Sequence, residues 1–298
     1  MAGRSTIDLS RLPPPDAVQV LDFETYFAAV KAEVIAFDPS LAADMELESS
    51  IGAKLLQVFA FRELLLRNRA NQSVRAVMPA LATGADLDQL AVIVGIQRLV
   101  VNPGDPEQGI TPTYEDDEAF RRRFTLAPDG FSVAGPAGAY EFHALSADGD
   151  VLDASATSPE PGQVLVTVLS RIDDGEASPA LLALVEAGVS ADDVRPLTDE
   201  VIVQSATIKP YSVQATLRTY AGPDPLVVMG AAEASLAEFI ATNHRLGRDV
   251  NLSGLYHALH VPGVQRVDLA APLANIVCDD TEAAFCTAVA LTHGGLDE

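Results

Sequence analysis

Glu141 and His143 are the residues in this sequence that come nearest to an acid–base catalytic pair. A carboxylate near an imidazole can orient the ring and support it as a general base. The two residues stand two positions apart, so on a helix they point to different sides and need a third group from elsewhere to share a ligand. A cytoplasmic hydrolase that uses Glu141 and His143 is therefore kept only as the alternative function.

His257 and His260 lie three positions apart, a spacing that places two imidazoles on one helix face and suits a metal ion. No carboxylate or cysteine accompanies them at a matching interval, so core or interface histidines are the expectation. Cys278 and Cys286 are the two cysteines of the chain, and their spacing of eight fits neither a zinc site nor a disulfide framework. We therefore expect no metal, no cofactor and buried thiols.

Other catalytic signatures fail on their spacing. The stretch 130–135 contains one residue too many for the turn that presents a nucleophilic serine. Pro136 removes a backbone donor from the glycine-containing stretch 135–138, which disfavours a phosphate-binding loop. The sequence therefore predicts a protein that is not an enzyme.

The charge balance excludes several classes of partner. The chain has 19 Lys and Arg against 42 Asp and Glu, a formal net charge of −23, whereas contacts to phosphate groups require clustered basic side chains. We therefore expect no binding to nucleic acid. No apolar run approaches the roughly 18 residues of a membrane span, so we expect no direct membrane insertion and synthesis in a cytoplasm.

The elements that must position these residues indicate an α+β fold. With 298 residues and 48% hydrophobic composition, the chain can bury two modest cores. A stretch rich in Pro and Gly at 102–114 reads as a loop and marks a boundary. We therefore expect an N-terminal helical region at 1–101, followed by two small mixed α/β units, a central domain at 102–205 and a C-terminal domain at 206–298.

Apolar periodicity and turn residues locate the individual elements. Asp86 and Thr113 are expected to cap the helices that follow them, and Pro79 is expected to kink the preceding helix or end it early. A loop at 128–136 precedes a helix that ends near 146. The other predicted helices are 16–37, 50–70, 115–126, 179–187, 224–242 and 251–260, and the predicted strands are 151–157, 164–170, 200–205, 212–220, 264–270 and 285–292.

The first predicted helix carries a seam of apolar side chains spaced four, three, four and three apart. Two interpretations of this seam stay open: packing within its own domain, or a helical bundle with another subunit. The residues of the seam are Phe23, Phe27, Val30, Val34 and Phe37.

The second predicted helix has an apolar side and a basic stripe. Ile51, Leu55, Phe59 and Leu66 share the apolar side, while Arg62 and Arg69 stand seven positions apart. A charge run of this kind is usually a solvated face, and an acidic groove on a partner is the alternative.

Several stretches in a fixed order resemble the baseplate assembly protein J family of contractile phage tails and phage-tail-like bacteriocins. The matching stretches extend over most of the chain, and none of them is a catalytic signature. They are 7–13, 21–24, 61–67, 82–90, 117–123, 126–132, 135–140 and 261–264, among them Ala82-Thr83-Gly84-Ala85-Asp86-Leu87-Asp88-Gln89-Leu90 and Leu126-Ala127-Pro128-Asp129-Gly130-Phe131-Ser132.

The resemblance implies a structural baseplate wedge subunit of a contractile tail, located in the virion or tail-particle baseplate. Its partners are then other wedge proteins, among them a sheath-initiator-like wedge protein and the periphery of the hub, and copies of itself that close a ring around the hub. The resemblance also implies that the N-terminal helices bundle with a partner, which favours that interpretation of the seam. No cofactor is implied.

The resemblance further implies that the C-terminal domain makes the contact between copies. By position alone, the self-association patch is expected to contain Leu246, Tyr256, Leu259, Val261 and Val264.

Overall fold

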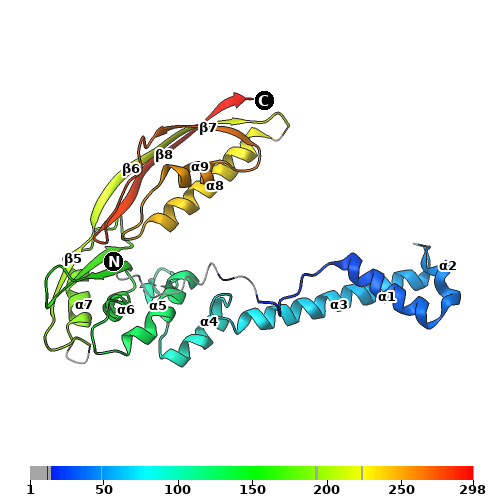
Figure 1. The fold of residues 1–298 in the computed structure, drawn as a ribbon, viewed down its shortest axis with the longest axis horizontal. Coiled ribbons are helices and arrows are strands. Elements are labelled where there is room, and N and C mark those ends of the chain that lie inside the picture. Colours follow the sequence, from blue (N-terminus) through cyan, green and yellow to red (C-terminus); the bar gives the residue numbers. More distant parts are fainter. Residues whose placement is uncertain (1–11, 13–14, 48, 192–193, 223, 298) are drawn as a thin grey trace. The chain divides into compact units, whose positions relative to one another are not determined.

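The computed structural model describes residues 12, 15–47, 49–191, 194–222 and 224–297. The chain divides into two compact units, Ile7–Gln97 and a larger unit that includes Arg98–Glu298. Figure 1 shows helices alone in the first unit, and helices with small sheets in the second. The predicted α+β class is therefore confirmed.

Two helices that lie side by side form the main body of the first unit (Figure 1). The helix α1 (Phe23–Phe37) begins after Asp22, whose carboxylate accepts a hydrogen bond from Thr25 N at 3.0 Å. This cap explains why the predicted start at residue 16 is wrong, because a capping residue has a non-helical backbone. The longer helix α3 (Ile51–Ala76) begins after Ser50, whose side chain accepts from Ala53 N at 3.3 Å.

Short helices connect and follow this pair. They are η2 (Pro39–Leu41), α2 (Ala42–Met45), α4 (Gly84–Ala91) and η3 (Val92–Val94). Helix α3 ends at Ala76, as expected ahead of Pro79. The prediction that Asp86 caps the next helix is wrong, because Thr83 occupies the cap position and Asp86 lies in the first turn.

A buried amide fixes the chain ahead of α1 to α3. Asn71 is 7% exposed, and its side chain accepts from Gln19 N at 3.0 Å and donates to Gln19 O at 2.8 Å. Arg67 adds a hydrogen bond to Gln19 Oε1 at 2.7 Å and lies 4.9 Å from the centre of the Tyr26 ring. The two helices are thus held together by polar contacts in addition to apolar ones.

The larger unit starts with a hairpin where the sequence predicts a loop. Strands β1 (Val100–Asn102) and β2 (Thr113–Tyr114) pair antiparallel, and Asp105 and Ile110 form a further bridge within the connection. Helix α5 (Asp117–Gly130) follows, and its N-cap is Asp116 instead of the predicted Thr113. This helix continues through Pro128, where a loop is predicted.

The central sheet has the strand order β3-β4-β5, with β3 (Val151–Thr157) antiparallel to β4 (Gln163–Ser170) and β4 parallel to β5 (Glu200–Ser205). Helices α6 (Ala137–Ala147) and α7 (Pro179–Val189) pack against it. Their buried side chains, Tyr140, Leu145, Leu181 and Val185 among them, form one core with the sheet.

The last sheet has the order β7-β6-β8, with β6 (Thr207–Thr219) antiparallel to β7 (Val264–Ala271) and parallel to β8 (Glu282–Leu296). Helices α8 (Pro225–Asn243) and α9 (Leu252–Leu259) supply the other half of this core. Among the described residues, α8 alone is long and apolar enough to cross a membrane. Its Val228, Ala232 and Leu236 are buried in the core with β6, whereas its other residues are half-buried or exposed.

Two glycines of the fold differ in the space that is available for a side chain. A Cβ at Gly149 would lie 2.2 Å from the backbone oxygen of Val100, whereas a Cβ at Gly230, inside α8, would meet no atom within 4 Å. We expect Gly149→Ala to lower the free energy of unfolding by about 1–3 kcal/mol through overpacking. Gly230→Ala should raise it by about 0.5–1 kcal/mol through helix propensity. Urea unfolding of both variants measures this, and equal effects of the two would contradict the described packing.

Candidate functional site

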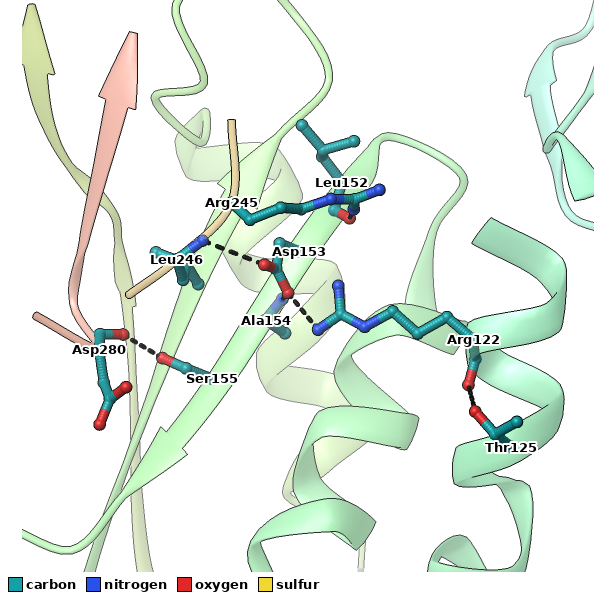
Figure 2. A network of polar contacts seen from close by, with 9 residues as sticks. All are labelled: Arg122, Thr125, Leu152, Asp153, Ala154, Ser155, Arg245, Leu246 and Asp280. Atoms are coloured by element: carbon teal, nitrogen blue, oxygen red, sulfur yellow. Dashed lines mark hydrogen bonds and ion pairs between the residues drawn. The ribbon is translucent and has the colours of Figure 1, made fainter. Parts of the chain in front are cut away.

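A buried carboxylate, Asp153, joins three segments of the larger unit (Figure 2). Asp153 lies on β3 and is 1% exposed. Its Oδ1 accepts from Arg122 of α5 and from Ala154 N, and its Oδ2 accepts from Leu246 N at 3.0 Å. One side chain therefore fixes α5, β3 and the segment after α8 to one another.

Further polar contacts cross between the central sheet and the last one. Arg245 donates to the backbone oxygen of Leu152 at 2.6 Å, and Ser155 Oγ donates to the backbone oxygen of Asp280. Figure 2 shows these contacts on either side of Asp153. The contacts of β3 with the C-terminal part thus run from Leu152 to Ser155.

Apolar packing accompanies this network. Ala206, which is 6% exposed, is the single residue between β5 and β6. It belongs to a buried cluster that takes Leu169 from the central sheet and Leu246 and Ala283 from the C-terminal part. The two domains therefore share a small core where the chain passes from one sheet to the next.

Asp153 also balances the positive charge at the junction. Burial would lower the pKa of the Arg122 guanidinium, but the charge and hydrogen bond of Asp153 outweigh it and raise that pKa. Burial lowers the pKa of Arg245, and the charge of Asp153 opposes this only in part. The cavity that Arg122, Arg171 and Arg245 line has a volume of about 10 Å³, room for about one water molecule. The geometry is that of a structural joint with no space for a substrate.

Glu141 and His143 take part in separate local contacts. Both lie on α6, where Glu141 is 7% exposed and its charge acts on Arg122. The Nε2 atom of His143 lies 3.2 Å from the backbone oxygen of Gly130, and its ring packs edge-on against Phe142. These contacts hold the end of α5 against α6.

His257 and His260 are exposed on the surface of the C-terminal domain, so the expectation that they pack in the core is wrong. His257 is in the last turn of α9, and His260 is its C-cap. Within the described residues, no group of three or more metal-ligating side chains exists. Cys278 is buried and Cys286 half-buried, and burial raises the pKa of both thiols. Both thiols are therefore neutral at pH 7.

The predicted seam on α1 lies partly between the two N-terminal helices. Phe23 and Phe27 stack with ring centres 6.0 Å apart, and they are half-buried, as are Val30 and Val34. Phe37 is 92% exposed, and no residue of α1 is fully buried. The structure thus brings four of the five residues together against α3 but leaves all of them some exposed surface.

A broader exposed face lies on α3, for which the sequence favours a solvated surface over a contact with an acidic partner groove. Only Ala53, Ala60 and Asn71 are buried among its 26 residues. Five large apolar side chains on the other side are 55–78% exposed, and their spacing keeps them within one face of the helix. We call them the α3 stripe: Ile51, Leu55, Val58, Phe59 and Leu66. Periodicity identified four of these residues as one side, but gave no sign that this side is uncovered.

The predicted self-association patch does not form one surface in the isolated chain. Leu246, Leu259 and Val264 are 0–2% exposed inside the C-terminal part. Val261 is half-buried against the same core, and Tyr256 is 42% exposed. Only Tyr256 and Val261 are thus accessible to a second copy.

Comparison with protein families covers most of the chain. The Baseplate J-like N-terminal domain matches residues 48–105, the Baseplate J-like central domain matches 132–205, and the Baseplate J-like protein C-terminal domain matches 211–292. The chain belongs to the Baseplate J family. This Baseplate J-like chain is also 47% identical to Baseplate protein J of Escherichia phage P2 over 300 residues, which covers 98% of this chain and 99% of that protein.

A solved structure adds a weaker likeness. A chain in the cryo-EM structure of the anti-feeding prophage baseplate shares 15% identity and a TM-score of 0.34, over 62% of this chain and 43% of that one. Family membership, which the 47% relative shows independently, makes this Baseplate J-like chain a structural protein of a phage or phage-like baseplate.

We expect one isosteric substitution at the junction, Asp153→Asn, to lower the free energy of unfolding substantially. Asp153→Asn keeps the shape and an acceptor for Leu246 N, but removes the counter-charge that is hydrogen-bonded to the Arg122 guanidinium. We expect the free energy of unfolding to fall by about 3 kcal/mol, the low end for a buried pair that loses one partner. Urea unfolding followed by circular dichroism measures this loss.

Asp268→Asn is the matched control, because Asp268 also pairs with an arginine, Arg266, but on the exposed surface of β7. Such exposed pairs contribute little, so this variant should unfold like the unmodified chain. Equal losses in the two variants would show that Asp153 has no special role at the junction.

Proposed function

We propose that this protein is a wedge subunit of a contractile-tail baseplate, which joins other wedge proteins through its N-terminal helices and copies of itself through its C-terminal domain. Three regions divide this work: 1–101 binds the partner, 102–205 connects, and 206–298 self-associates. The partners include a sheath-initiator-like wedge protein and the periphery of the hub, and assembly takes place in the host cytoplasm. The protein acts without catalysis.

The exposed α3 stripe is the observation that carries the proposal. A two-helix unit that leaves Ile51, Phe59 and Leu66 63–78% exposed keeps a contiguous apolar face in water, which marks a protein–protein contact. Steps of four residues from Ile51 to Leu55 and from Leu55 to Phe59, and of seven from Phe59 to Leu66, are those of a helix that packs against another helix. An additional helix from a partner would cover this face and complete a bundle with α1 and α3.

The charge of α3 specifies the kind of partner. The helix contains five basic residues, Lys54, Arg62, Arg67, Arg69 and Arg75, against the single acidic Glu63, a local excess of +4 in a chain of net charge −23. Arg62 and Arg69 are exposed and lie three or four positions from residues of the stripe, on the same face of the helix. A partner helix with apolar residues flanked by Asp or Glu fits this surface.

The family resemblance supports a contact between copies through the C-terminal domain. Of the five residues predicted for it, Tyr256 and Val261 stay candidates, because the other three pack inside the domain.

Acidic substitutions on the α3 stripe should abolish partner binding without destabilising the fold. Leu55→Asp with Phe59→Asp places two carboxylates in the proposed helix contact, at positions that are 55% and 63% exposed in the free chain. We expect co-purification with the neighbouring tail proteins of the source to be lost, while the melting temperature stays unchanged. Affinity purification from co-expressing cells and circular dichroism measure the two properties.

Gln57→Asp is the control, since Gln57 is exposed on the same helix but outside the stripe. It adds one carboxylate where the double variant adds two, and it should leave co-purification intact. If the double variant still captured its partners at the level of the control, the α3 stripe would not be the binding surface.

A further inference from the structure

Strand β8 presents a long free edge. It is the outer strand of the order β7-β6-β8, so β6 occupies one of its two edges. On the other edge, a bridge from Leu246 to Ala283 and a hydrogen bond from Gly247 N to Glu282 O cover its first residues. Among the described residues, no strand or bridge pairs with that edge from 287 onward. Its backbone donors and acceptors there are available to another extended chain.

The sequence of this edge lacks the features that normally block strand pairing. Residues 283–296 contain no Asp, Glu, Lys, Arg or Pro, although charged residues and proline are the usual protection of an exposed edge. The opposite edge of the same sheet, β7, carries Arg266 and Asp268 on exposed positions. In the central sheet, the edge strand β5 begins with Glu200 and β3 contains Asp153. Of the two edges of the C-terminal sheet, that of β8 is therefore the one without a charged residue from 283 to 296.

The side chains along β8 make it complementary to a copy of itself. The register with β6 places Val289 and Leu291 opposite Val213 and Ala215, which are buried under the helices, while Ala288, Ala290 and Thr292 lie on the other face. Side chains of opposed antiparallel residues contact each other on one face of the sheet. If two β8 strands ran antiparallel about Ala290, Val289 would meet Leu291 of the copy.

Charge favours a second copy as the occupant of this edge. The region 206–298 has five basic and ten acidic residues, a net charge of −5, so two copies repel each other over most of their surface. The uncharged stretch 283–296 is where this repulsion is weakest. Val289 is 48% exposed in the free chain, and pairing would cover it without burying a charge.

We infer that β8 pairs antiparallel with β8 of a second copy of this chain, centred on Ala290, so that two three-stranded sheets join into one. The inference rests on the proposed self-association of the C-terminal domain and identifies its surface. In this arrangement Ala290 faces its own counterpart, and Ala288 faces Thr292 of the copy.

Disulfide trapping in the full chain tests the register. Opposed residues of antiparallel strands have Cα atoms about 4.5–5.5 Å apart, within the range a disulfide requires. In a Cys286→Ser background, Ala290→Cys should form a covalent dimer under mild oxidation, whereas Thr292→Cys alone should not. A mixture of Ala288→Cys and Thr292→Cys chains should give the mixed dimer. Non-reducing electrophoresis reads out all three.

Native mass by light scattering, at several protein concentrations and with co-expressed neighbours, tests the same edge without cysteines. Val289→Lys should return the dimer to a monomer. Val277→Lys, at an exposed valine that is 64% accessible and outside β8, should leave the dimer intact.

The outcomes separate the two levels of the proposal. A dimer that persists in Val289→Lys, is lost in Tyr256→Asp and does not cross-link at residue 290 would overturn the β8 contact but keep the proposed self-association. A chain that is monomeric under every condition, alone or co-expressed, would overturn both. Cross-linking at 290 together with loss of the dimer in Val289→Lys supports the inference.

Discussion

The carboxylate of Asp153 is the interaction on which the arrangement of the larger unit depends. A charge that is 1% exposed must be compensated where it lies, and here the compensation comes from Arg122 of α5 and from the backbone of Leu246 beyond α8. Moving the C-terminal domain away from the central sheet would take from this carboxylate its hydrogen bond with Leu246 N. The two domains are therefore joined by polar contacts as well as by the small apolar cluster around Ala206.

The N-terminal unit, in contrast, has few buried contacts of its own. Its long helix buries three residues out of 26 and leaves large apolar side chains in water, so the unit gains little from its own core. Burial of an amphipathic face supplies most of the stability of helices in proteins, so under the proposed function a partner helix supplies part of the stability of this pair. A rigid joint in one unit and an unfinished bundle in the other suit a subunit that connects several neighbours in a baseplate.

The sequence predicted the elements better than their partners. Strand β3 was predicted at its observed bounds, because Gly149 before it and Pro159 after it mark turns. The hairpin from β1 to β2 was missed, since its pairing depends on contacts that local propensity does not encode. Periodicity grouped Ile51, Leu55 and Phe59 on one face without revealing whether that face is covered. For the same reason Leu246 and Leu259, apolar residues of the core, were assigned to an interface. The Asp inside the apolar strand β3 was the available signal for the junction.

Under the proposed function, this chain is a structural subunit that works only as part of an assembly. The most direct test is the native mass of the unmodified chain, measured by light scattering after size exclusion, when it is co-expressed with the adjacent tail genes of its source. The account predicts a stable complex that contains at least two different tail proteins and exceeds the mass of a homodimer. A monodisperse 31.4 kDa monomer that ignores every neighbour would contradict it.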